Sequence, residues 1–288
     1  MLSYRHGFHA GNHADVLKHT TLVACLRAMR AKETPLLYVD THAGAGSYAL
    51  REGFAAQNDE WAGGVERLAA FAGNENPPPV VADYLAAVIG PGGAQAMERY
   101  PGSPAIAAAW LRPQDRLALF ELHPSDYGPL SAMFSGDRRA RVVNADGFSG
   151  LRGTLPPPSR RALVLIDPSY ELAADYERAI EALREALRRF ATGVYAVWYP
   201  LLERPEAKAL PRRLMDLAAE AGPRGAASLD ARLRVRGSRP GERGMAGSGL
   251  VVFNPPWRLA DGLREALPYL ARALGDDADA SWDLETRE

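Results

Sequence analysis

Residues 35–46 read PLLYVDTHAGAG, a short apolar run that ends at an acid and is followed by two closely spaced glycines. The apolar run is typical of a buried strand, and glycines in the turn that follows let the backbone come close to a ligand. In an open α/β sheet, the turn after the first strand is where nucleotides bind. The stretch therefore predicts the first strand of an α/β sheet, with a ligand at its carboxyl end.

Further apolar runs have the same character and alternate with helical segments; they cover residues 117–121, 141–144, 162–167, 193–198, 231–235 and 249–253. Nearly continuous apolar strands suit a sheet that is covered on both faces. Residues 14–32 and 175–190 carry apolar side chains at helical spacing. Strands alternating with helices predict a Rossmann-like α/β fold, with a mostly parallel sheet and helices on both faces.

One interval is too long for a simple strand–helix–strand unit. It runs from Asp40 to the strand near Leu117 and contains two helix-like pieces, residues 61–71 and 80–89. We interpret residues 51–102 as a small helical insertion, so that residues 1–50 and 103–288 form the core. The tail after Gly275 is strongly acidic, and we expect it to be a solvated end.

Composition sets limits on the partners. The net charge of −1 excludes a broadly basic nucleic-acid coating protein, so any nucleic-acid surface must be a local patch. The single cysteine, Cys25, has no partner for an internal disulfide and is expected in the core. No apolar run is long enough to span a membrane, and the N-terminus does not read as a signal peptide. We expect a soluble, cytoplasmic protein without membrane contact.

Acids follow the first three core strands: Asp40, Glu121 and Asp146, the last beside Gly147. Carboxylates accept hydrogen bonds from ribose hydroxyls and from the amine of an adenine ring. They suit a cofactor without phosphates, which favours S-adenosylmethionine over a nicotinamide dinucleotide. Two alternatives stay open. Gly44 to Ala49 also fits the G-x-G-x-x-A dinucleotide pattern, and an acid at a strand end is also a common helix cap.

The fourth core strand ends in Asp167-Pro168-Ser169-Tyr170. The lone pair of an aryl amine is delocalised into its ring, and acceptors aimed at both N–H groups expose it to an electrophilic methyl group. The Asp167 carboxylate and the Pro168 carbonyl supply two such acceptors, and Tyr170 is placed to stack on the base. A plain turn after a strand is the alternative interpretation.

Asn254-Pro255-Pro256-Trp257 fits the general Asn/Asp-Pro-Pro-aromatic pattern better than Asp167 to Tyr170 does. A catalytic loop should lie beside the strand that binds the cofactor, and the fourth core strand neighbours the first at the switch point of the sheet. The later strand is remote in that order. We therefore interpret residues 254–257 as a structural turn.

The chain resembles the RlmJ family, the bacterial 23S ribosomal RNA adenine-N6 methyltransferases, from Met1 to about Trp257. The resemblance is carried by MLSYRHGFHAGNHADVLKH at residues 1–19, DTHAGAG at 40–46, PGSP at 101–104, ELHPSDY at 121–127 and WYP at 198–200. It implies a class I methyltransferase sheet, S-adenosylmethionine as cofactor and 23S ribosomal RNA as partner. The family has proline where this chain has Ser169. This departure removes one rigid ring from the loop but leaves the acceptor groups in place, so we expect activity to persist, at a rate that depends on how loose the loop is.

The resemblance also implies roles for individual residues. Asp167 would be the catalytic acceptor, with Pro168 and Tyr170 beside it, and Tyr4 would gate the target adenine. Together with the acids and the glycine turn, the expected cofactor contacts are Lys18, His19, Asp40, His42, Gly44, Ser103, Glu121, Asp146, Gly147 and Asp167.

Two local clusters complete the predictions. Four of the six histidines lie in the first twenty residues, but without paired cysteines or regular ligand spacing, so we expect no metal. A run rich in arginine is expected to contact RNA phosphates, through Arg232, Arg234, Arg236, Arg239 and Arg243. A solvated hairpin is the alternative there. For the whole protein, the competing hypotheses are a nicotinamide-dependent reductase, a methyltransferase acting on another nucleic acid, and a non-catalytic RNA-binding relative. We expect a monomer.

Overall fold

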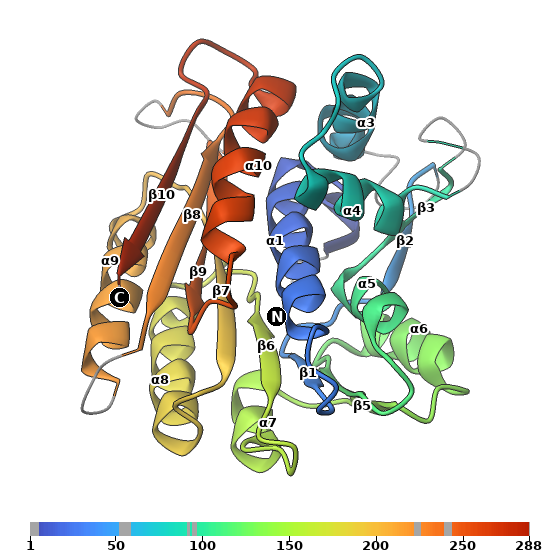
Figure 1. The fold of residues 1–288 in the computed structure, drawn as a ribbon, viewed down its shortest axis with the longest axis vertical. Coiled ribbons are helices and arrows are strands. Elements are labelled where there is room, and N and C mark those ends of the chain that lie inside the picture. Colours follow the sequence, from blue (N-terminus) through green and yellow to red (C-terminus); the bar gives the residue numbers. More distant parts are fainter. Residues whose placement is uncertain are drawn as a thin grey trace.

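Eight strands form one sheet in the order β10-β8-β9-β7-β6-β1-β4-β5 (Figure 1). The structure, a computed structural model, describes residues 6–51, 59–90, 93, 97–221, 226–238 and 244–287. The strands of this sheet are β1 (Leu37–Asp40), β4 (Arg116–Phe120), β5 (Ala140–Val143), β6 (Ala162–Ile166), β7 (Val194–Pro200), β8 (Ser228–Arg234), β9 (Gly247–Phe253) and β10 (Ser281–Arg287).

Five adjacent strands, β5-β4-β1-β6-β7, run parallel, and all the apolar runs predicted from the sequence are strands. The central strand β1 pairs with β4 on one side and β6 on the other. The chain moves outward from β1 to β4 and β5 and then returns to β6. This reversal opens a crevice at the carboxyl ends of the strands, where ligands of open α/β sheets bind.

Helices cover both faces of the sheet (Figure 1), as predicted. On one face α1 packs against α5 and α10; on the other α8 packs against α7 and α9. The helices are α1 (His13–Met29), α5 (Ser103–Trp110), α6 (Pro124–Phe134), α7 (Gly147–Thr154), α8 (Ala173–Arg189), α9 (Pro205–Glu220) and α10 (Leu259–Leu274), after a short 3-10 turn η1 (His6–Phe8). Helix α1 is buried along most of its length, and Cys25 is part of the core.

The tail after Gly275 is a correction to the sequence prediction. Residues 281–287 form strand β10, which pairs antiparallel with β8 along its whole length. Two of its acids contact an arginine of β8: Arg232 Nη1 is 3.1 Å from Asp283, and Arg232 Nη2 is 3.4 Å from Glu285. The acidic residues that suggested a solvated end therefore offset the positive charge of Arg232 on the neighbouring strand.

Two short strands, β2 (Ser47–Ala49) and β3 (Arg99–Pro101), pair antiparallel outside the main sheet. The segment between them contains the helical elements η2 (Ala62–Glu66), α3 (Arg67–Ala72) and α4 (Pro79–Val88). Helix α4 packs against α1, and α3 packs against α10. In the described part of the chain, no helix has the length and apolar character needed to cross a membrane.

Candidate active site

A cavity of about 430 Å³ opens at the carboxyl ends of β1, β4, β5 and β6, where the strand order reverses. Ten residues predicted as functional from the sequence line it, although they come from six separate parts of the chain. They are Lys18, His19, His42, Gly44, Ser103, Glu121, Asp146, Gly147, Asp167 and Pro168.

Asp167, directly after β6, is held by a buried lysine. Lys18 Nζ, on the second turn of α1, lies 2.6 Å from Asp167 Oδ2 and 2.7 Å from Asp15 Oδ1. The Lys18 side chain is 4% exposed, and that of Asp167 is 12% exposed. Burial opposes the charge of Lys18, but the two carboxylates outweigh it and raise its pKa. The ammonium group therefore stays charged and fixes one oxygen of Asp167.

Asp15 is a site residue that the sequence prediction missed. It is 1% exposed, and its second oxygen accepts a hydrogen bond of 2.8 Å from Gly11 N. An acid three residues before a lysine in a helix usually marks a solvent-exposed pair. The apolar residues around Asp15 and Lys18 were the available signal that this pair is buried instead.

The loop after β6 is constrained at its fourth residue. Tyr170 has φ +51°, a left-handed conformation that costs about 1 kcal/mol or more for a residue with a side chain. Its hydroxyl donates to the carbonyl of Trp198 at 2.9 Å, and its ring packs on Tyr176 and Trp198. At 1% exposure the ring does not line the cavity. The structure differs here from the predicted stacking on a base, because Tyr170 anchors the loop from behind.

Asp40 also lies behind the cavity instead of lining it, unlike the prediction. It is fully buried, and its Oδ2 accepts hydrogen bonds from Ser103 Oγ and Tyr38 Oη, both at 2.7 Å. Burial raises the pKa of Asp40, and these two donors act against that rise. Because Ser103 reaches the cavity, Asp40 acts on the site by orienting Ser103.

Glu121, at the end of β4, faces the glycine turn across the cavity. Its oxygens accept hydrogen bonds from Gly44 N at 2.8 Å and His123 N at 2.6 Å. Burial raises the pKa of Glu121, although both backbone donors oppose the rise. Gly44 has φ +60°, and a Cβ there would lie 2.0 Å from the Tyr48 hydroxyl, so this position requires glycine.

The far wall of the cavity is the start of α7. Asp146 caps the helix by accepting from Ser149 Oγ at 2.7 Å, and its other oxygen binds Arg178 at 2.9 Å. Burial acts to raise the pKa of Asp146, but these two partners lower it. The capping alternative is therefore present, and the carboxylate still lines the cavity. His42 lies against Phe148, with ring centroids 4.9 Å apart, and burial lowers its pKa to about 4.

A family model described as Ribosomal RNA large subunit methyltransferase D, RlmJ, matches residues 33–287. The chain belongs to this family of ribosomal RNA methyltransferases. Two proteins named Ribosomal RNA large subunit methyltransferase J are similar to it. That of Escherichia coli K12 is 44% identical over 274 residues, covering 95% of this chain and 94% of the relative. That of Haemophilus influenzae is 42% identical over 287 residues, covering 99% and 98%.

A crystal structure of a Legionella pneumophila protein has the same fold. It superposes with a TM-score of 0.83 at 32% sequence identity, covering 96% of this chain and 98% of that one. The predicted family and the predicted α/β methyltransferase fold are both confirmed.

Residues 254–257 form the other loop of this RlmJ family member that fits the catalytic sequence pattern, and they lie at the opposite edge of the sheet. Strand β9 runs antiparallel to β7, so its carboxyl end points away from the cavity. Asn254, with φ +49°, donates to the carbonyls of Ala191 at 2.8 Å and Gly193 at 2.7 Å. Residues 254–257 are therefore a structural turn, and strand direction excludes them from the site.

The glycine turn after β1 also differs from a dinucleotide-binding turn. Residues 47–49 form strand β2, whereas a pyrophosphate site needs a helix to begin there. The reductase alternative therefore lacks its main structural element. Among the described residues, no group of three or more His, Cys, Asp and Glu side chains is arranged to hold a metal ion.

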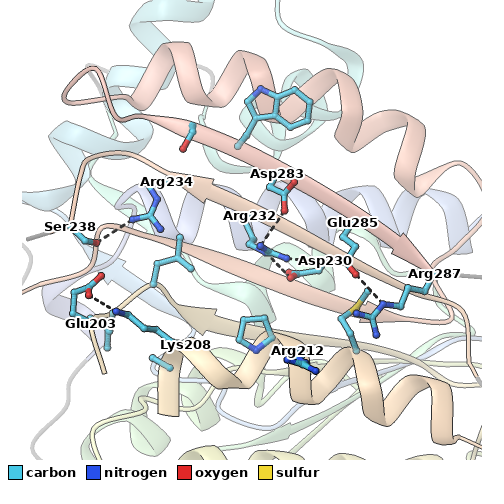
Figure 2. A pocket seen from close by; sticks show the side chains of 17 residues that line it. Glu203, Lys208, Arg212, Asp230, Arg232, Arg234, Ser238, Asp283, Glu285 and Arg287 are labelled. Atoms are coloured by element: carbon cyan, nitrogen blue, oxygen red, sulfur yellow. Dashed lines mark hydrogen bonds and ion pairs between the residues drawn. The ribbon is translucent and has the colours of Figure 1, made fainter. Parts of the chain in front are cut away.

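A second, larger groove of about 620 Å³ lies between α9 and the strands β8 and β10 (Figure 2). Its charged groups are bound mainly to one another, as Figure 2 shows. Arg232 contacts Asp230, Asp283 and Glu285, and Lys208 contacts Glu203. Arg232 and Arg234, both predicted to contact RNA, line this groove, and Arg234 donates to Ser238 Oγ at 3.2 Å. The three acids around Arg232 occupy its guanidinium group, which does not suit the predicted phosphate contact. Acids and bases alternate in the groove, so we assign it no catalytic role.

Three predicted RNA contacts lie outside the described residues: Tyr4, Arg239 and Arg243. Arg234 and Arg236 are described, and both lie at or just beyond the end of β8. Because β8 runs in the same direction as β6, that end is at the same edge of the sheet as Asp167.

Proposed function

We propose that this protein transfers a methyl group from S-adenosylmethionine to the N6 amine of an adenine in 23S ribosomal RNA. The observation that carries the proposal is the Asp167 carboxylate, which is fixed by Lys18 at the mouth of a ligand-sized cavity. Family membership supports the RNA class, since both relatives are named for the large ribosomal subunit. The chemistry of the site supports the choice of base and of cofactor.

The cavity wall suits a cofactor rich in hydroxyl and amine groups. Its carboxylates outnumber its cations; they are Glu121, Asp126, Asp146, Asp167, Glu171 and Asp175. The cations Lys18 and Arg178 are both engaged by carboxylates. A pyrophosphate would be repelled by such a wall, whereas ribose hydroxyls and an amino group find acceptors. The residues that would hold S-adenosylmethionine are Lys18, His19, His42, Gly44, Ser103, Glu121, Asp146, Gly147 and Asp167, with Asp40 acting through Ser103.

When bound, S-adenosylmethionine supplies an electrophilic methyl group. The chain's own task is to orient the amine and to take its proton. Lys18 occupies Oδ2 of Asp167, and no described residue forms a hydrogen bond to the other oxygen. That oxygen and the Pro168 carbonyl are two acceptors for the two N–H groups of the amine. As nitrogen gains the methyl carbon it becomes acidic, and Asp167 accepts the proton.

The remaining assignments concern the surroundings of the site. We place phosphate contacts at Arg234, Arg236, Arg239 and Arg243, and the gate for the target base at Tyr4. Residues 51–102 form a helical insertion in a core made of residues 1–50 and 103–288. We place the protein in the cytoplasm, together with its ribosomal RNA substrate, and assign it a monomeric state.

The test is methyl transfer to 23S ribosomal RNA from cells that lack the modification, with N6-methyladenosine identified by mass spectrometry. The unaltered protein should form N6-methyladenosine, and Asp167→Ala should reduce the rate by a factor of about 100 or more. Asn254→Gly is the matched control, because it alters the rival loop and keeps its left-handed backbone. Full activity in Asp167→Ala, or loss of activity in a folded Asn254→Gly, would overturn the assignment.

A further inference from the structure

Three buried polar side chains connect the helical segment between β2 and β3 to the cavity. The hydroxyl oxygens of Tyr84 on α4 and Tyr100 on β3 are 3.1 Å apart. The Tyr100 hydroxyl is 2.7 Å from Nδ1 of His19 on α1. Both tyrosines are 0% exposed and His19 is 1% exposed, and the His19 ring lines the cavity. The chain of hydrogen bonds therefore ends at the wall of the site.

The geometry also holds the His19 ring in place. Its ring stacks on that of Tyr100, with centroids 5.6 Å apart and planes 24° from parallel. Tyr100 is fixed in turn by the β2–β3 ladder, where it pairs with Tyr48, another residue of the cavity wall. Stacking and hydrogen bonding together leave little freedom for the imidazole to turn.

The direction of the hydrogen bonds follows from counting donors and acceptors. Burial raises the pKa of both Tyr84 and Tyr100, so both hydroxyls keep their hydrogens at neutral pH. Buried hydroxyl hydrogens need acceptors. If His19 Nδ1 donated to Tyr100, one of the two hydroxyl hydrogens would have no acceptor within this chain of hydrogen bonds. If Tyr84 donates to Tyr100 and Tyr100 donates to Nδ1, both hydroxyl hydrogens have acceptors, and the remaining ring hydrogen lies on Nε2.

We propose that Tyr84 and Tyr100 are positioning residues that fix His19 as the neutral tautomer with its proton on Nε2. In that form the ring is a hydrogen-bond donor for an oxygen of the bound cofactor. The inference rests on the proposed function only for the identity of that cofactor. It gives the helical segment a direct role at the site, since a hydroxyl on α4 sets which nitrogen of a cavity residue carries hydrogen.

The tautomer is measured directly in the cofactor-free protein. Long-range ¹H–¹⁵N correlation spectra of protein labelled at histidine distinguish a protonated Nε2 from a protonated Nδ1, and a His19→Gln variant identifies the signals. We expect the Nε2–H form in the unaltered protein. Tyr100→Phe should shift the balance toward the other tautomer, and Tyr84→Phe should shift the Nδ1 resonance. An Nδ1–H form in the unaltered protein, or an unchanged His19 spectrum in Tyr100→Phe, would overturn the proposal.

Binding and turnover provide the second measurement. Tyr100→Phe should raise the dissociation constant for S-adenosylmethionine roughly threefold to tenfold, the loss expected for one hydrogen bond, and change kcat at saturating cofactor less. Tyr195→Phe is the matched control; Tyr195 is a buried tyrosine whose hydroxyl bonds the carbonyls of Ala186 and Phe190, away from the cavity. Equal weakening in both variants would contradict a positioning role.

The two proposals fail separately. An Nε2–H tautomer in a protein that transfers no methyl group would refute the proposed function and leave the inference standing. Methyl transfer with an Nδ1–H tautomer would do the reverse.

Discussion

Lys18 is the residue on which the electrostatics of the site depend. Three charges buried together are stable only if each has a partner, and Lys18 bridges Asp15 and Asp167 at 2.7 and 2.6 Å. Asp15 supplies a second negative charge beside the ammonium group, so the positive charge of Lys18 is shared between two carboxylates. Lys18 thus holds the Asp167 carboxylate in place at a position that solvent barely reaches.

Glu121 predicts how cofactor binding depends on pH. Burial raises its pKa, so it takes up a proton at a higher pH than an exposed glutamate. The folded state then binds this proton more tightly than the unfolded chain, so the contribution of Glu121 to stability grows as pH falls. Cofactor binding goes the other way, because a protonated carboxyl is a poorer acceptor for ribose hydroxyls. We expect the dissociation constant for S-adenosylmethionine to rise as the pH falls from about 7 toward 5, and to do so at a higher pH than it would for an exposed glutamate.

Calorimetry across this pH range checks the expectation. Glu121→Gln should bind more weakly at pH 7 and show little pH dependence. His42 does not contribute to this pH dependence, because its pKa of about 4 keeps the ring mainly neutral between pH 7 and pH 5. The same pH dependence in Glu121→Gln as in the unaltered protein would assign the effect to another group.

Among the elements, the start of α7 has the tightest packing demand. A Cβ on Gly147 would lie 1.9 Å from the carbonyl oxygen of Thr41, so the turn after β1 and the helix after β5 approach each other through glycine. Gly147→Ala should therefore destabilise the fold by about 2 kcal/mol and weaken cofactor binding. Thermal unfolding and calorimetry measure both effects.

Gly153 is the control on the same helix. A Cβ added to Gly153 would meet no described atom within 4 Å, so Gly153→Ala should stabilise the protein by about 0.5 kcal/mol. Equal melting temperatures for the two variants would show that the contact at Thr41 is not limiting.

The elements also show what the sequence could and could not predict. Fully buried strands such as β6 were recognisable because burial on both faces leaves a continuous apolar pattern. Strand β10 was missed because its residues are exposed or half-buried, and because the partner of Asp283 and Glu285 on β8, Arg232, is distant in the sequence. Strands β2 and β3 have three residues each, too few for any periodicity.

The residues of the site were likewise predictable in part. Acids at strand ends were predictable because parallel strands bring their carboxyl ends to one edge. The sequence could not predict whether such an acid faces the cavity. Asp40, for example, turns toward Ser103 and Tyr38 instead. Tyr170 was predicted to stack on the base, but its ring packs on Tyr176 and Trp198 behind the loop, and no local pattern in the sequence marks its left-handed backbone.

At the scale of the whole molecule, a net charge of −1 gives no general attraction to RNA, so binding must rest on a few placed cations. Arg234 ends β8 at the same edge of the sheet as Asp167, whereas Arg258 follows the turn at the opposite edge. Arg234→Gln should weaken RNA binding and reduce the slope of log affinity against log salt by about one. The value of kcat at saturating RNA should stay unchanged, because the phosphate contact is remote from the reacting amine.

Titrating fluorescent RNA at several salt concentrations measures this slope, and Arg258→Gln is the matched control. Both substitutions change the net charge equally, so a purely global effect would move both slopes alike. If RNA contacts Arg234 at the cavity edge, only the slope measured for Arg234→Gln should change. An unchanged slope for Arg234→Gln would place the RNA elsewhere and return the end of β8 to the solvated hairpin that the sequence also allowed. A fall in slope confined to Arg234→Gln would instead fix the direction in which RNA crosses the sheet edge, from β8 toward the loop that carries Asp167.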